Sequence, residues 1–316
     1  MSGAGDGVLV VNYHYCQPPD NGVFSGMTSV RPDKFAAQVD SMRARFRPLR
    51  ASDLPAAESG FLITFDDGTR DVFEHALPIL KAAAVPAVIY CCSQPVLEGR
   101  VLDVQKVHML QSRLGRERFR RAFLDLLAEL PNGGERDDPS ALGLDYMYRY
   151  DDPETRRFKF LLNVELPYHL LSSVLERMFA EEFGDEREIV RHVYMSEDDI
   201  RRAADMGFEI GVHTHAHRLL SRLDAGAQRA EIETPLNLFQ DLLGERTFTM
   251  SYPYGIRGSF NATTKSVLTD LGIGVAFSLG RRIHRLDQQC DLLEIPRFDV
   301  NDVFDAQGEL IVPEAA

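Results

Sequence analysis

The sequence predicts an α/β fold built on a parallel sheet or barrel. The main observation is that short apolar, β-branched segments alternate with longer amphipathic segments, which is typical of βαβ units. The second observation is the size of the chain. Its 316 residues, 44% of them hydrophobic, suit one large domain, because an α/β barrel reaches this length around a single core.

Several short apolar segments have the composition of buried strands. They lie at residues 8–13, 62–65, 87–91, 208–212, 247–252 and 273–279. Helix signals lie between them. Residues 35–46 have helical periodicity, and Ser196, before three acidic residues, marks the start of a helix that ends at Gly207. A further helix is expected over 222–243, with a kink at Pro235.

Residues 99–194 interrupt this alternation, because they contain three helical patterns and no strand pattern. The patterns lie at 104–114, 119–130 and 167–183, and their apolar residues recur at the spacing of a buried helix face. We therefore expect a helical insertion between two strands. Because it begins just after the strand at 87–91, we predict a lid over the strand ends. A structural or dimerisation insert far from the site is the alternative.

The charge and hydropathy patterns argue against two classes of partner. A net charge of −13 and a pI of about 5.2 argue against a nucleic-acid-binding protein, which needs clustered basic residues. No apolar run is long enough to predict a membrane span. The first fifteen residues lack the basic region and the cleavage site of a secretory signal, which predicts a cytoplasmic protein.

Two adjacent carboxylates, Asp66 and Asp67, follow the strand at 62–65 in the segment Thr-Phe-Asp-Asp-Gly. The carboxyl ends of parallel strands are where α/β barrels build their sites. Two buried carboxylates there need a metal or hydrogen bonds to compensate their charge. The alternative is a turn that caps the next helix, for which Asp-Asp-Gly-Thr is also suitable.

Two histidines, His213 and His217, follow the strand at 208–212. One helical turn would place both imidazoles on the same face, at the spacing that metal ligands need. Two imidazoles and one carboxylate form a recurring catalytic zinc set. For this pattern alone an exposed helix start is the alternative. His215, between the two, is expected to point away from the metal.

The Asp and His motifs together resemble the polysaccharide deacetylase family, of the NodB-homology or carbohydrate esterase family 4 type. The matching segments are Thr-Phe-Asp-Asp-Gly at 64–68, His-Thr-x-x-His at 213–217 and Tyr-Pro-Tyr-Gly at 252–255. The resemblance covers nearly the whole chain. It implies an irregular (β/α) barrel of about seven strands, forming a single catalytic domain over residues 1–316.

The resemblance also implies a role for each motif residue. Asp66 is the implied general base, and the implied ligands of one divalent metal are Asp67, His213 and His217. Zinc is the favoured metal, although cobalt, nickel and iron accept the same ligands. The backbone N–H of Tyr254 is implied to stabilise the oxyanion, since Pro253 before it has no donor.

The chain departs from the family pattern in three places. Ser251 stands where the family often has an arginine against the catalytic base, and we predict that Arg297 supplies the guanidinium instead. The sequence has no tryptophan, which the family usually has. The late Leu-x-His motif, whose histidine is the family's general acid, is missing. We assign the general acid to His14, because a Tyr-His near the start of the chain resembles the poly-N-acetylglucosamine deacetylase branch. His284 is a weaker candidate, expected at the surface.

We therefore expect a metal-dependent hydrolase that removes an acyl group from the amide nitrogen of an amino sugar. The insertion and the absence of a signal favour a small intracellular glycoside or sugar conjugate as substrate. A deformylase, an O-acetyl esterase and a cyclic-amide hydrolase are alternatives on the same fold. A non-catalytic sugar-binding relative is a further alternative, against which the presence of Asp66 argues. A homo-oligomer is left open.

Overall fold

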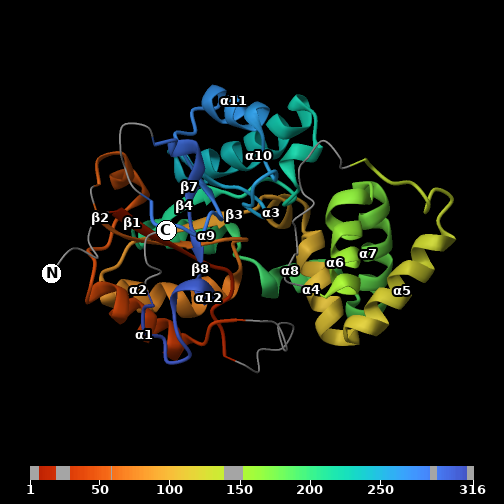
Figure 1. Ribbon diagram of the computed structural model, residues 1–316, viewed down its shortest axis with the longest axis horizontal. Helices are drawn as coiled ribbons and strands as arrows, with labels where there is room; N and C mark the ends of the chain where they lie inside the picture. The colour runs from red at the N-terminus through yellow and green to blue at the C-terminus, as the bar shows by residue number, and fades with distance from the viewer. Residues whose placement is uncertain (1–6, 19–28, 58, 139–151, 285–289, 312–316) are drawn as a thin grey trace.

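The centre of the protein is a parallel β-sheet, seen in a computed structural model that describes residues 7–18, 29–57, 59–138, 152–284 and 290–311 (Figure 1). Its strands are ordered β7-β6-β5-β4-β3-β2-β1-β8, so neighbours in the sheet are mostly neighbours in the chain. The strands are β1 (Gly7–Tyr13), β2 (Ser59–Phe65), β3 (Ala87–Cys91), β4 (Glu209–Val212), β5 (Thr249–Ser251), β6 (Val275–Ser278), β7 (Ile295–Pro296) and β8 (Phe298–Asp299).

The last extended segment nearly closes this sheet into a barrel. β7 pairs with β6 and β8 pairs with β1, yet only Arg297 separates β7 from β8 in the sequence. One segment therefore joins both edges of the sheet, and the eight strands correspond to seven extended segments. The predicted α/β class and irregular barrel are confirmed, and Arg297 lies at the seam.

Alternation along the strands directs every second side chain into the barrel. Val8 and Val10 of β1 belong to the same buried cluster as Tyr90 of β3 and Phe277 of β6. The rings of Tyr90 and Phe277 are 5.8 Å apart although their strands are not neighbours, which identifies this cluster as the barrel interior. The next residue on that face of β1 is Asn12, so the interior becomes polar at the carboxyl end.

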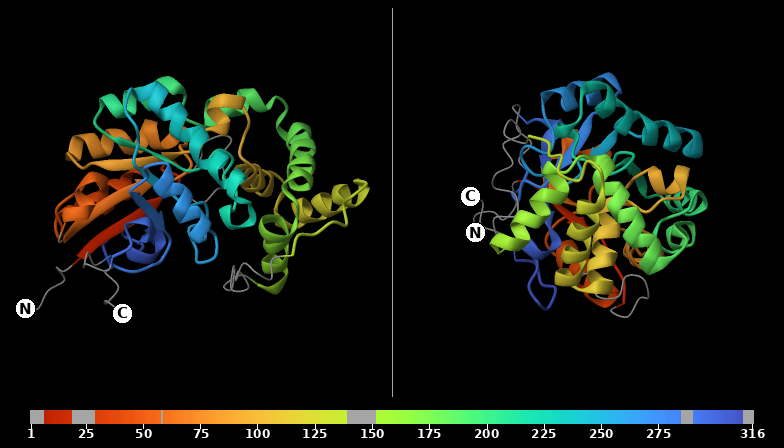
Figure 2. Two further views of the ribbon diagram at one scale, coloured as in Figure 1. Left: turned by 90° about the horizontal axis from the view of Figure 1, so that it is seen from above. Right: turned by 90° about the vertical axis from the view of Figure 1, so that its right-hand side faces the viewer.

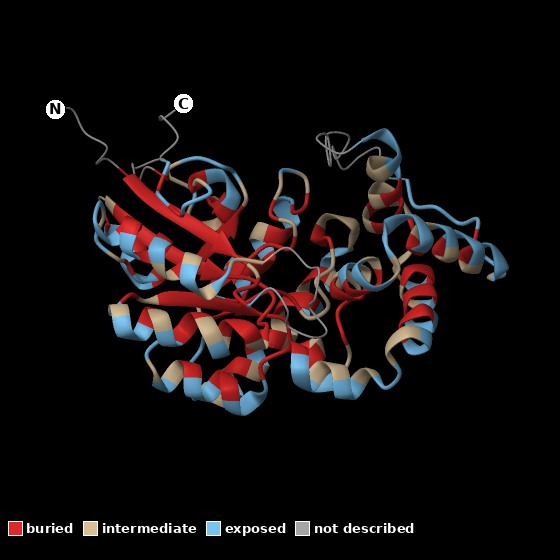
Figure 3. Cartoon of the chain, turned by 90° about the horizontal axis from the view of Figure 1, so that it is seen from below, coloured by how far each residue is buried: buried red, intermediate tan, exposed pale blue. Residues whose placement is uncertain are grey.

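Helices cover the outside of the barrel, and the strands beneath them are almost wholly buried (Figure 3). The covering elements are α1 (Pro32–Arg43), the π-helix η3 (Val72–Ala76), α2 (Leu77–Ala83), α9 (Glu197–Asp205), the 3-10 helix η6 (Leu220–Arg222), α10 (Ala225–Leu243), α11 (Ala262–Asp270), the 3-10 helix η7 (Leu292–Glu294) and α12 (Val300–Val303). The 3-10 helix η2 (Ala51–Ala56) instead contributes Ala51 and Leu54 to the interior cluster. Helix α10 runs through Pro235. None of the helices in the described ranges is both long and apolar enough to cross a membrane.

The segment between β3 and α9 is largely helical and stands to one side of the barrel (Figures 1 and 2). Its elements are α3 (Gln94–Glu98), α4 (Asp103–Leu114), α5 (Arg116–Glu129), α6 (Pro153–Phe160), the π-helix η5 (Leu161–Glu165), α7 (Tyr168–Phe183) and α8 (Glu186–Val193). Helices α4, α5 and α7 match the three helical patterns of the sequence. Residues 139–151 of the segment lie outside the described residues.

This insertion has a hydrophobic cluster distinct from the two barrel clusters, joined from the barrel side by Tyr15 and Cys92. Phe119 and Phe123 of α5 make edge contacts with Phe158 of α6, with ring centroids 5.7–5.8 Å apart. The buried Lys106 of α4 forms an ion pair with Glu186 of α8, at 2.8 Å, which fixes the two ends of the insertion to each other. The insertion is therefore a packed unit whose two ends are joined.

Candidate active site

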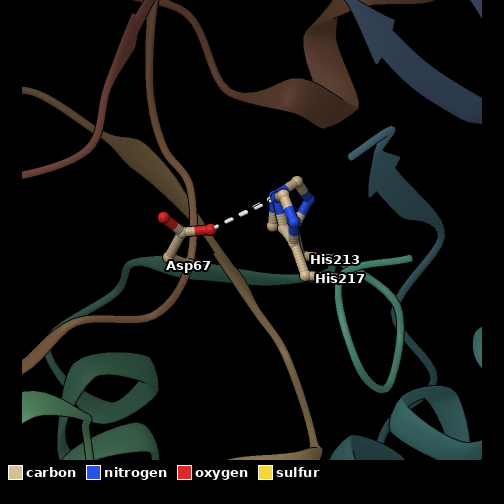
Figure 4. A group of neighbouring side chains, drawn as sticks. All are labelled: Asp67, His213 and His217. Carbon is tan, nitrogen blue, oxygen red and sulfur yellow. Dashed lines mark ion pairs between the residues drawn. The ribbon is translucent and has the colours of Figure 1, made fainter. Parts of the chain in front are cut away.

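Asp66 and Asp67 lie in a tight turn directly after β2. Asp67 has a φ of 74° and Gly68 a φ of 66°, so both adopt the left-handed conformation that favours glycine. A Cβ on Gly68 would lie 2.7 Å from the sulfur of Cys91, so the turn needs a glycine there for space as well. The carboxylate of Asp67 faces His213 and His217 in the loop after β4 (Figure 4), whereas that of Asp66 accepts hydrogen bonds from Arg297.

His213 and His217 are brought together by an irregular loop, and the helical turn expected from their spacing is wrong. Thr214 and His217 have φ values of 67° and 55°, and left-handed residues cannot continue an α-helix. The carboxylate of Glu231 accepts hydrogen bonds from two successive backbone N–H groups between the histidines, which holds the loop. The two imidazole centroids end 4.8 Å apart.

Asp67, His213 and His217 converge on one point (Figure 4). The Oδ1 atom of Asp67 lies 3.5 Å from Nε2 of His213 and 3.6 Å from Nε2 of His217. This Oδ1 is buried and accepts no hydrogen bond, which is costly for a carboxylate unless a cation compensates it. Two imidazoles and a carboxylate oxygen in this arrangement fit a divalent metal.

The hydrogen bonding of His213 and the protonation state of His217 also suit metal binding. The Nδ1 atom of His213 lies 2.8 Å from the backbone carbonyl of Ser251, a contact that only a protonated Nδ1 makes, so Nε2 is left for a metal. Burial lowers the pKa of His217 to about 4, which keeps this imidazole neutral. Burial raises the pKa of Asp67, but the proximity of the imidazoles of His213 and His217 lowers it by more, to about 2.

Asp66 is held by the guanidinium of Arg297 from the barrel seam. The two Nη atoms of Arg297 donate to Oδ1 and Oδ2 of Asp66 at 2.9 and 2.8 Å, and Asn12 donates to Oδ2 at 3.1 Å. Burial raises the pKa of Asp66, but the positive charge of Arg297 and the proximity of His213 lower it well below its usual range. The carboxylate is therefore ionised and ready to accept a proton.

Arg297 has three further partners that fix its position inside the barrel. It donates to Oδ1 of Asn12 at 2.8 Å, to Oγ1 of Thr64 at 3.0 Å and to Oγ of Ser251 at 2.8 Å. Ser251 stands at the position where the family pattern has its arginine. The guanidinium therefore reaches the carboxylate from a different strand, and the serine hydroxyl accepts one of its hydrogen bonds.

A cavity of about 480 Å³ brings together the seven residues that the sequence assigned to the site, which are His14, Asp66, Asp67, His213, His217, Tyr254 and Arg297. Its barrel side is formed by Asn12, His14, Asp66, Asp67, His213, Ala216, His217, Arg218, Tyr254, Leu279 and Arg297. Tyr254 adopts a left-handed φ of 63°. Its ring lies 5.2 Å from that of His217, and its hydroxyl donates to Oδ1 of Asn163 in η5, at 2.9 Å.

The two remaining histidines of the sequence motifs lie away from this cavity. His215 contacts Ser93 at 2.8 Å and Glu98 at 3.1 Å, so it points away from the metal ligands as predicted. His284 was expected at the surface, and this is wrong. Its backbone pairs with Val8 at the start of β1, the opposite end from His14, and its side chain is buried.

The other wall of the cavity comes from the insertion, and the sequence did not single out its polar members. They include His108 and Gln111 of α4, Arg116 and Arg120 of α5, and Lys159 of α6. Burial lowers the pKa of His108. For His108, Gln111 and Arg120, which lie on predicted helical patterns, the available signal was a polar stripe, which is also what a solvated face looks like. Gln105 of α4 was missed for the same reason, and it donates to Oδ2 of Asp67 at 2.7 Å.

Part of the chain matches a known protein family. Residues 177–276 match the family model described as polysaccharide deacetylase, a range that contains His213, His217 and Tyr254. No curated protein matches the chain. The predicted resemblance to the polysaccharide deacetylases is confirmed, and deacetylases of this family are hydrolases.

Solved structures share the fold over nearly the full length. The deacetylase PplD of Streptococcus pyogenes, in complex with acetate, is 14% identical with a TM-score of 0.57, covering 94% of this chain and 93% of that chain. IcaB from Ammonifex degensii is 17% identical with a TM-score of 0.54, covering 94% and 92%. A de-N-acetylase from Aggregatibacter actinomycetemcomitans is 14% identical with a TM-score of 0.51, covering 93% and 94%. At these identities the likeness concerns the fold.

Proposed function

We propose that the protein is a metal-dependent N-deacetylase that hydrolyses the amide of a small N-acyl amino sugar. The observation that carries this proposal is the pairing of two different carboxylates in one cavity. Asp67 faces two imidazoles with an unpartnered oxygen, whereas Asp66 is kept ionised by Arg297. A binding protein needs the first arrangement only, and a hydrolase also needs the second.

The residues of the cavity supply the proton transfers of amide hydrolysis. A divalent metal held by Asp67, His213 and His217 would lower the pKa of the attacking water and polarise the amide carbonyl. Asp66 accepts the proton of the attacking water, and Arg297 holds its carboxylate in place. The backbone N–H of Tyr254 donates to the carbonyl oxygen as negative charge develops. His14 donates a proton to the nitrogen that leaves as an amine.

The products distinguish this proposal from its alternatives on the same fold. An N-deacetylase releases acetate and a free amine from an N-acetyl sugar in equal amounts. An O-acetyl esterase would release acetate and a free hydroxyl, a deformylase would release formate, and a sugar-binding relative would release nothing. Parallel assays for amine, acetate and formate on one panel of substrates therefore separate these four, and a cyclic-amide hydrolase would open a ring and release neither acid.

We further propose that the insertion restricts the site to small substrates. The insertion contributes one wall of the cavity, and its hydrogen bonds reach both sides of the barrel mouth, through Gln105 to Asp67 and through Asn163 to Tyr254. A cavity of about 480 Å³ is within the range of about 300–1,000 Å³ that small-molecule sites occupy. The cytoplasmic location expected from the sequence stays a prediction.

Activity is accordingly expected to be no higher on oligosaccharides than on a monomeric N-acetyl sugar conjugate. The reason is that the insertion forms one wall of the cavity and blocks the space that additional sugar units would need. The measurement is kcat/KM on a monomeric conjugate and on oligomers of increasing length. If kcat/KM rises steeply with length, the site is an open groove and the proposed restriction is wrong.

Replacing His14 with alanine is expected to slow amide hydrolysis far more than hydrolysis of an activated aryl ester. An amine needs a proton in order to leave, whereas an activated phenolate leaves without one. His108→Ala is the matched control, since His108 lines the same cavity from the insertion. Equal losses on both substrates in His14→Ala would assign His14 a structural role, and selective loss in His108→Ala alone would transfer the acid to that residue.

A further inference from the structure

We propose that Gln105, on helix α4 of the insertion, is a positioning residue for the metal ligand Asp67. The side chain of Gln105 is fully buried, and its Nε2 donates to Oδ2 of Asp67 at 2.7 Å. The other carboxylate oxygen, Oδ1, faces His213 and His217. The two oxygens of Asp67 therefore have separate tasks, with one fixed by the insertion and the other directed to the metal position.

The orientation of the Gln105 amide is set by a chain of hydrogen bonds within the insertion. The backbone N–H of Leu102 donates to the hydroxyl of Tyr194 at 3.1 Å, and that hydroxyl donates to Oε1 of Gln105 at 3.2 Å. The hydroxyl has one proton, which it gives to Oε1, so the amide presents its NH₂ group to Asp67. All of these groups are buried, which strengthens each bond.

A second attachment joins the insertion to the same turn. Tyr194 at the end of the insertion forms a β-bridge with Thr69, and the N–H of Met195 donates to the carbonyl of Gly68 at 3.0 Å. The turn that carries Asp67 is thus held from one side by α4 and from the other by the end of the insertion. This makes the insertion part of the metal centre as well as a wall of the cavity.

The expected loss of metal affinity follows from the general role of residues that orient metal ligands by hydrogen bonds. A hydrogen bond to the outer oxygen keeps a carboxylate in one rotamer and prevents both oxygens from turning to the metal. Loss of such a partner weakens metal binding by about 10–100-fold. This inference rests on the metal site of the proposed function, and it adds a residue that does not itself contact the metal.

The test is the metal affinity of Gln105→Leu, measured by competition with a chelator of known affinity, together with the visible spectrum of the cobalt-loaded protein. Gln111→Leu is the matched control, because Gln111 lies on the same helix and lines the same cavity. We expect Zn²⁺ binding about 10–100-fold weaker in Gln105→Leu and a changed cobalt spectrum, with both unchanged in Gln111→Leu. Thermal unfolding of the metal-free proteins separates this effect from loss of the fold.

Wild-type affinity and an unchanged cobalt spectrum in Gln105→Leu would overturn the inference. Should that variant fail to fold, Tyr194→Phe takes its place, since it removes only the hydroxyl that orients the amide. Weaker metal binding in a folded Tyr194→Phe supports the inference, and unchanged binding contradicts it. Failure of the wild-type protein to bind any divalent metal would instead refute the metal site of the proposed function.

Discussion

Replacing Asp66 with asparagine is expected to lower kcat by about 10²–10⁴-fold while the protein keeps its bound metal. The amide has the shape of the carboxylate but cannot accept the proton of water. The metal ligands are unaffected, because Asp67 alone of the two residues faces His213 and His217. Arg297 retains its hydrogen bonds to Asn12, Thr64 and Ser251, so we expect the variant to fold.

Asp71→Asn is the matched control for loss of a buried carboxylate. Burial raises the pKa of Asp71 to about 7, so near neutral pH an amide resembles its protonated form. Asp71 does not line the cavity, and we expect its variant to retain turnover. Steady-state kinetics with metal analysis of both variants is the measurement. Near-normal turnover in Asp66→Asn would show that another group takes the proton.

Replacing Arg297 with methionine is expected to destabilise the fold by about 3–5 kcal/mol at neutral pH, because it leaves the charge of Asp66 buried without its partner. Arg297→Lys keeps the charge but not the bidentate geometry, so this variant should lose less stability than Arg297→Met. Denaturant unfolding of both variants measures the difference. Equal stability of wild type and Arg297→Met would mean that the ion pair contributes nothing to the fold.

The effects of Arg297→Met on activity and stability should depend on pH. In the wild type Arg297 lowers the pKa of Asp66, so the base stays ionised well below neutral pH. Without the guanidinium, burial raises that pKa, and the acidic limb of the kcat/KM profile should move to higher pH. The destabilisation should be smallest at strongly acidic pH, where Asp66 is protonated even beside Arg297, and should grow as the pH rises toward the raised pKa of Asp66 in the variant. An acidic limb at the wild-type pH would contradict this account of the pair.

The parts of the fold that sequence patterns predicted are those set by local, repetitive features. The strand expected at 208–212 is observed at Glu209–Val212, and the helix expected at 104–114 begins one residue earlier, at Asp103. Buried strands and amphipathic helices need apolar residues at fixed intervals, which a single sequence displays. Helix α6 was missed, since its sequence PETRRFKF is dominated by polar residues and only Phe158 is buried.

The site residues that lie in short sequence motifs were predicted. Those that reach the site through contacts between distant parts of the chain were missed. Asp67 and His217 are recognisable from their neighbours in the chain. The left-handed conformation of His217 is unfavourable locally and is imposed by tertiary contacts, so the spacing alone gave the wrong backbone. Gln105 lies 38 residues from Asp67, and only the folded chain shows that the two side chains meet.

The central claim is that one divalent metal at Asp67, His213 and His217 enables this protein to hydrolyse the amide of an N-acyl amino sugar. The most direct measurement titrates Zn²⁺ into metal-stripped protein and follows the release of acetate and free amine from an N-acetyl sugar conjugate. Both products are expected to appear together, with activity saturating at about one metal per chain. The His213→Ala, His217→Ala double variant should neither bind metal nor turn over. Full activity of the stripped protein, or undiminished metal content in the double variant, would contradict the claim.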